Sequence, residues 1–125
     1  METALRSKLV QEIPELVDQI YPTNAPEGVL KPYLVYARIS TRKTKTLEGY
    51  TGDETLSFMF SVMATRYSDM KSLAKKVENF LMSLPGTYIG EDGIYIQDVD
   101  INNVTEQYEH ELKVNRGIID FTIYF

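Results

Sequence analysis

The chain has 125 residues, a formal net charge of -5 and no cysteine. This length suits one hydrophobic core, and we expect residues 1–125 to form a single domain. The acidic balance argues against a general nucleic-acid binder, and the lack of cysteine excludes disulfides, thiolate metal sites and a cysteine nucleophile. No apolar run approaches the length of a bilayer span and no signal peptide is recognisable, so we expect cytoplasmic synthesis and no membrane partner.

The first elements are a helix and a long connection. Apolar residues between Thr3 and Ile13 fall on one helical face, and Pro14 ends the pattern. Residues 14–32 contain four of the five prolines, which predicts a connection with at most a short extended piece at Ile20 and Tyr21. Residues 33–42 are rich in β-branched and aromatic side chains and predict a strand.

Residues 54–86 carry the strongest pattern in the chain. Apolar and polar residues alternate from Leu56 to Ala64, which predicts a strand with one buried face. From Met70 to Leu84 the apolar residues recur at helical spacing, with lysines on the opposite side. We expect Ser68 or Asp69 to cap this helix and Pro85 with Gly86 to end it.

Residues 41–53 contain Arg42, Lys43 and Lys45 and almost no side chain that would enter a core. Two interpretations remain open. The segment forms a long loop over residues 42–52, or the two neighbouring strands extend further and meet in a short turn near Glu48 and Gly49. We expect the loop, mobile in the free chain and ordered on assembly, because few of its side chains can be buried.

The last third predicts a β-meander. Gly90 and Gly93 indicate a tight hairpin between residues 88–89 and 94–96, residues 98–105 predict a strand, and a turn near 107–111 leads to a final strand over 117–125. That strand has a strong apolar face and should lie inside the sheet. The predicted fold class is α+β, with a mainly antiparallel sheet, two helices packed on one face, and the order α-β-β-α-β-β-β.

Residues 98–109 are compatible with a calcium loop as well as with a strand. Oxygen-bearing side chains fall at positions 1, 3, 5, 9 and 12 of a twelve-residue loop: Asp98, Asp100, Asn102, Glu106 and Glu109. The sixth position is Asn103 rather than glycine, and the flanking residues predict strands instead of helices. A small calcium- or ligand-binding module is therefore the alternative function, and a solvated strand face explains the same residues.

Catalytic chemistry has no comparable support. His110 is the only histidine, lies in a polar turn, and is accompanied by no nucleophile-elbow sequence. We expect no catalytic residues, no cofactor and no enzyme activity. Met59 and Met63 lie on the less apolar side of the central strand, where exposed methionine favours an adaptable interface and a covering loop or helix would bury it.

The chain resembles the tail-completion proteins of long-tailed bacteriophages, also called tail terminator or head-to-tail joining proteins. The resemblance rests on Ile-Tyr-Pro at 20–22, Ala-Pro at 25–26, KPYLVY at 31–36, the central strand and helix, and RGIIDF at 116–121. It extends over nearly the whole chain, and residues 42–53 match nothing in particular.

The resemblance implies a structural virion protein from a phage or prophage. It implies a ring, hexameric in this family, that ends polymerisation of the tail tube and joins the tail to the head connector. The implied partners are other copies of the chain, the major tail tube protein, connector proteins and DNA passing nearby. For this chain we expect an assembly interface that includes Arg42, Lys43, Lys45, Glu48, Tyr50, Met59 and Met63.

Overall fold

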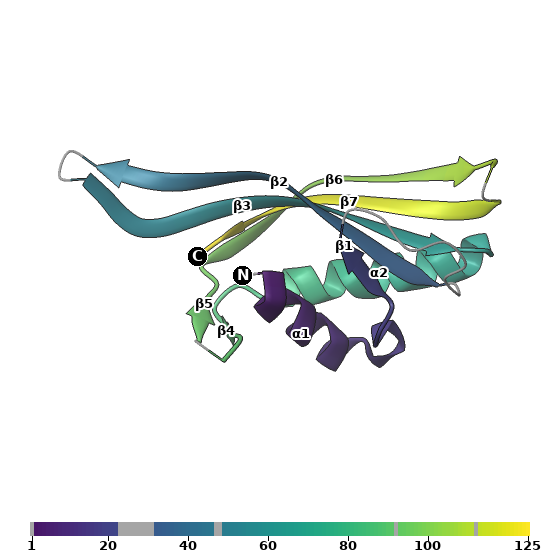
Figure 1. Ribbon diagram of the computed structural model, residues 1–125, viewed down its shortest axis with the longest axis horizontal. Coiled ribbons are helices and arrows are strands. Elements are labelled where there is room, and N and C mark those ends of the chain that lie inside the picture. The colour runs from purple at the N-terminus through teal and green to yellow at the C-terminus, as the bar shows by residue number, and fades with distance from the viewer. Residues whose placement is uncertain (1, 23–31, 47–48, 92, 112) are drawn as a thin grey trace.

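The computed structural model describes residues 2–22, 32–46, 49–91, 93–111 and 113–125, and for Glu2, 38–46 and 49–54 it describes the backbone alone. Two α-helices lie on one side of a long sheet (Figure 1). The elements are α1 (Glu2–Glu12), the 3-10 helix η1 (Pro14–Leu16), β1 (Ile20–Pro22), β2 (Tyr33–Thr46), β3 (Gly49–Ala64), α2 (Tyr67–Ser83), β4 (Tyr88–Ile89), β5 (Ile94–Tyr95), β6 (Asp98–Glu109) and β7 (Val114–Tyr124). The predicted α+β class is confirmed.

The main sheet has the order β1-β2-β3-β7-β6, and β4 and β5 form a separate hairpin. Only β1 and β2 are parallel, while β2–β3, β3–β7 and β7–β6 are antiparallel. The final strand therefore lies inside the sheet, as its apolar face predicts. Both β6 and β7 are longer than expected, because the turn between them lies beyond Glu109 and β7 begins at Val114.

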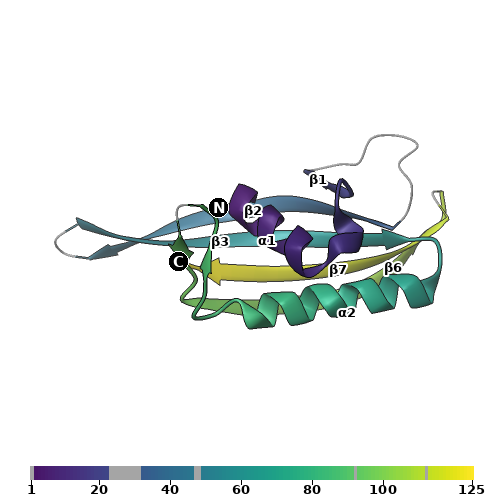
Figure 2. The same cartoon turned by 90° about the horizontal axis from the view of Figure 1, so that it is seen from below.

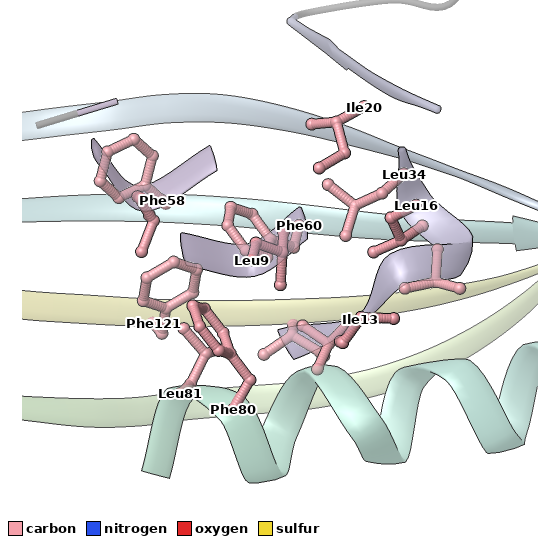
Figure 3. Close-up of a cluster of buried hydrophobic side chains, with 14 of the residues drawn as sticks. Leu9, Ile13, Leu16, Ile20, Leu34, Phe58, Phe60, Phe80, Leu81 and Phe121 are labelled. Atoms are coloured by element: carbon pink, nitrogen blue, oxygen red, sulfur yellow. The ribbon is translucent and has the colours of Figure 1, made fainter. Parts of the chain in front are cut away.

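The core fills the space between the sheet and the helices (Figure 3). Alternation places Leu56, Phe58, Phe60, Val62 and Ala64 of β3 on the inner face, and all five are buried. Phe60 and Phe121 meet edge to face with ring centroids 4.7 Å apart, and Phe58 stacks on Phe121 at 5.6 Å. Such pairs add to the stabilisation from apolar burial and join β3 to β7.

Helix α2 covers β3 and β7 with its apolar side, and α1 lies beside it on the same face of the sheet (Figures 1 and 2). Met70, Leu73, Val77 and Leu81 are among its buried residues, as the helical spacing predicts. The predicted cap, Ser68 or Asp69, is wrong by two or three residues, because the helix begins at Tyr67 with Arg66 at the N-cap and no side-chain cap bond. Gly86 follows the helix with φ of 82°, a conformation that suits glycine.

No helix in the described part of the chain is long and apolar enough to cross a bilayer.

Candidate assembly surface

The predicted loop over residues 42–52 is wrong. Strands β2 and β3 continue through this segment as an antiparallel pair, with Arg42 opposite Thr55, Lys43 opposite Glu54 and Lys45 opposite Tyr50. The alternative of two longer strands is confirmed, and their connection, which includes Glu48, lies outside the described residues. Threonine and tyrosine suit strand geometry without contributing to a core, so a polar hairpin gives no apolar pattern to predict it.

The far part of this hairpin is a two-stranded arm. Pairing of β3 with β7 ends at Thr55 and Tyr124, and β1 pairs with β2 only as far as Tyr36. Figure 1 shows the arm extending past the other strands. Residues 43–46 and 49–54 of the arm pair with no strand outside the arm among the described strands. An isolated two-stranded hairpin is marginally stable in water, so the arm would gain from a third strand.

The two methionines of the expected interface differ in exposure. Met63 is 8% exposed and packs with Tyr33 and Val114 in a small cluster on the outer face of the sheet. Its expected exposure is therefore wrong, because two neighbouring strands of the same chain cover it. Met59 is half-buried on the same face, two register positions away from the polar Ser57.

On the outer face of the sheet, opposite the helices, polar side chains of neighbouring strands form hydrogen bonds. Asn102 Nδ2 donates to Thr122 Oγ1 at 2.9 Å, and the Thr122 hydroxyl lies 3.0 Å from Ser57 Oγ. This row crosses β6, β7 and β3. Asp120 lies on the same face, between Met59 and Asn103, and its Oδ1 is buried without a hydrogen-bond partner.

Arg116 donates three side-chain hydrogen bonds on this face. Its Nε and Nη2 donate to Ser61 Oγ at 3.2 and 2.9 Å, and its Nη1 donates to Glu109 Oε1 at 3.2 Å. Ser61 is 2% exposed, so its hydroxyl depends on these donors for an interaction. The sequence alone did not predict this group, although alternation along β7 places Arg116 on the face opposite Ile119.

Strand β6 is an exposed edge. It is the last strand of the sheet, none of its twelve residues is buried, and its acidic residues are Asp98, Asp100, Glu106 and Glu109. The calcium interpretation is wrong for this geometry, because an extended strand separates Asp98 from Glu109 by about 36 Å, whereas calcium ligands surround one ion. Within the described residues, no three His, Asp or Glu side chains gather as a metal site.

A salt bridge joins the β6 edge to α2. Lys71 Nζ lies 2.5 Å from Glu106 Oε1. The hydrogen bond from Lys71, followed by one from Tyr67, lowers the pKa of Glu106, and the same carboxylate raises the pKa values of Lys71 and Tyr67. A second hydroxyl contacts this strand, since Tyr124 donates to Asp100 Oδ2 at 2.8 Å, a bond that raises the Tyr124 pKa.

Exposed aromatic side chains form pairs in the β4–β5 hairpin and at the end of β6. Tyr88 and Tyr95 of the β4–β5 hairpin pack together with centroids 5.0 Å apart, although both are exposed. Tyr108 and His110 meet edge to face at the end of β6. Tyrosine is enriched at protein interfaces, so these pairs extend the surface available for assembly.

Comparison with known proteins assigns the fold to a family. The tail completion protein gp17 family matches residues 3–125. The chain belongs to this family. Its role is thus in bacteriophage tail completion and virion assembly, as the resemblance implied, and tail completion is a structural task.

A solved structure entitled "Virion of native gene transfer agent (GTA) particle" contains a chain of similar fold. The TM-score is 0.69 at 14% sequence identity, and the match covers 98% of this family member and 95% of the other chain. At this identity the likeness concerns the fold. No match was found among curated proteins.

Proposed function

We propose that the chain forms a closed ring, hexameric as the resemblance implies, that ends polymerisation of the tail tube and joins the finished tail to the head connector. The observation that carries the proposal is the family match over residues 3–125. The similar fold of a chain in a virion structure supports a place in an assembled particle. Its partners are then copies of itself, the major tail tube protein and connector proteins, and it is made in the host cytoplasm.

The shape of the chain suits this role. The arm of β2 and β3 reaches beyond the helices and carries Arg42, Lys43 and Lys45, which we propose as contacts to a neighbouring subunit, the connector or DNA phosphates (Figure 1). Met59 remains a candidate for the same interface. An enzyme is not needed for any of these steps, and we propose none.

Depletion of the chain during phage production tests the proposal. We expect tails of excessive length and filled heads without tails, seen by electron microscopy, and we expect the purified chain to restore joining when it is added to the lysate. Tails of normal length that join heads in the absence of the chain would overturn the proposed function.

A further inference from the structure

The main sheet has two open edges that lie on opposite sides of the molecule (Figure 2). One is β6, whose outer side pairs with no described strand. The other is β2, where the short strand β1 covers only Leu34, Val35 and Tyr36. From Ala37 to Thr46 no described strand lies on that side of β2. Open edges present unpaired backbone donors and acceptors that a further strand can bind.

The two edges carry opposite charge. Residues 98–109 of β6 contain four acidic residues and no basic one. Residues 37–46 of β2 contain four basic residues and no acidic one: Arg38, Arg42, Lys43 and Lys45. Part of the acidic charge is already balanced, because Lys71 pairs with Glu106 and Arg116 with Glu109. Within the described residues, no salt bridge neutralises Asp98 or Asp100.

This distribution discriminates between modes of association. Two β6 edges repel each other, and so do two β2 edges, so a symmetric dimer through either edge is disfavoured. A β6 edge and a β2 edge attract. Contact between two different patches of identical subunits is head to tail, and such contacts form rings when the rotation closes.

Strand direction is compatible with this contact. Each step from β2 through β3 and β7 to β6 is antiparallel, so β6 runs opposite to β2. When two copies stand side by side in the same orientation, β6 of one and β2 of the next are therefore antiparallel. Because β1 covers the start of the β2 edge, the incoming strand must lie along residues 37–46, toward the arm. A stagger of this kind accompanies every closed ring of strands.

Charges and bulges on edge strands also serve to prevent pairing. Register shifts occur in β2 near residues 39 and 44 and in β6 near 102. Protection against unwanted pairing requires only charged residues, of either sign, on each edge, and lysine is the residue most often used for it. It does not explain why one edge is wholly basic and the other wholly acidic.

We propose that β6 of one copy binds the β2 edge of a second copy, residues 37–46, and adds a third strand to its arm. The inference rests on the proposed ring and names the surfaces that close it. The partner is thus another copy of this chain, held by backbone hydrogen bonds and selected by charge.

Charge exchange tests the pairing directly. The variant Asp98→Lys with Asp100→Lys makes β6 more basic, and the variant Arg42→Glu with Lys45→Glu makes β2 more acidic. Each purified variant should stay monomeric at concentrations about tenfold above the assembly midpoint of the wild type, measured by light scattering or mass photometry. An equimolar mixture should assemble, because each basic edge then meets an acidic one, and so should the chain carrying all four changes.

Control variants separate this effect from general charge. Glu12→Lys with Glu91→Lys changes the net charge by the same amount as the β6 variant, but on exposed residues of the helix side of the molecule. It should assemble like the wild type. Circular dichroism confirms that each variant is folded. Rising salt should weaken wild-type assembly, since it screens the edges.

Assembly of both single-edge variants as readily as the wild type would overturn the pairing, and so would a mixture that remains monomeric. A wild type that is monomeric at every concentration would also overturn it. The first two results concern only the surfaces of contact, the third also concerns the proposed ring, and the depletion experiment decides tail completion by itself.

Discussion

Gly117 of β7 lies directly against Met70 of α2. A Cβ at position 117 would come within 2.8 Å of Met70 Sδ and 3.4 Å of Ala74 Cβ. The helix therefore approaches the sheet so closely at this point that any side chain at position 117 would require Met70 to move. This contact sets the position of the first turns of α2 over β7.

We expect Gly117→Val to destabilise the protein by about 1 to 3 kcal/mol, the range for overpacking a core. Because the clash is with one flexible side chain, a second change of Met70→Ala should offset part of the loss, so that the double variant costs less than the sum of the single variants. Urea unfolding of the three variants measures this coupling. Strictly additive losses would show that the two residues do not compete for the same space.

Truncating the aromatic side chains on the inner face of the sheet should destabilise the protein. Phe60 and Phe121 are 2% and 0% exposed and pack edge to face. We expect Phe60→Ala or Phe121→Ala to cost about 3 to 5 kcal/mol in urea unfolding. Met82→Ala, on the exposed side of α2, is the control and should stay within about 0.5 kcal/mol of the wild type. Losses below about 1 kcal/mol at both phenylalanines would contradict the assignment of the strand faces.

The outer face depends on Arg116. Its removal in Arg116→Ala leaves the buried Ser61 hydroxyl without the two donors that it accepts from, so we expect a loss of about 1 to 3 kcal/mol. Glu109→Gln removes only the partly exposed ion pair and should cost about 1 kcal/mol or less, and still less at high salt. If the two variants are equally destabilised, the bond to Ser61 contributes nothing measurable.

Periodicity predicts most of this fold. Alternation from Leu56 to Ala64 and helical spacing from Met70 to Leu84 both reflect burial against a core, and burial is what the structure shows for these residues. The arm could not be predicted in the same way, because a polar two-stranded hairpin has no buried face to leave a pattern.

The predictions that were wrong at single residues share one cause. The structure at each of these residues depends on contacts with residues distant in sequence. Met63 is buried by Tyr33 and Val114, which reach it only through the register of three strands. Oxygens at every second residue from Asp98 to Asn102 fit a loop around calcium or one side of a strand. Only the pairing of β6 with β7 decides between them.

Acid should weaken the link between α2 and β6. The pKa of Glu106 is lowered in the folded chain, chiefly by Lys71, so the pair stabilises the fold above the ordinary carboxyl pKa of 4.5. That contribution is lost as pH falls through the lowered pKa. We expect Lys71→Gln to shift the Glu106 titration, followed by carbon NMR, toward higher pH, while Lys75→Gln leaves it in place. An identical titration in both variants would show that Lys71 does not hold the carboxylate.

Shortening the arm should separate its role in assembly from its contribution to stability. Arg42 is paired with Thr55, so joining them through an Asn-Gly turn removes residues 43–54 and leaves a two-residue hairpin connection. The removed residues pair with no strand outside the arm among those described, and the helices and the inner core stay complete. We therefore expect a thermal midpoint close to that of the wild type.

The same deletion removes Lys43 and Lys45, two of the four basic residues on the β2 edge on which the proposed subunit contact depends. We expect the shortened chain to fail in joining tails to heads, measured as infectious particles after complementation of a depleted phage. A milder variant, Thr44→Ser, keeps the arm and its charges and should complement fully. Infectious particles from the shortened chain would show that the arm is dispensable, and a large fall in its thermal midpoint would show instead that the arm belongs to the folded body.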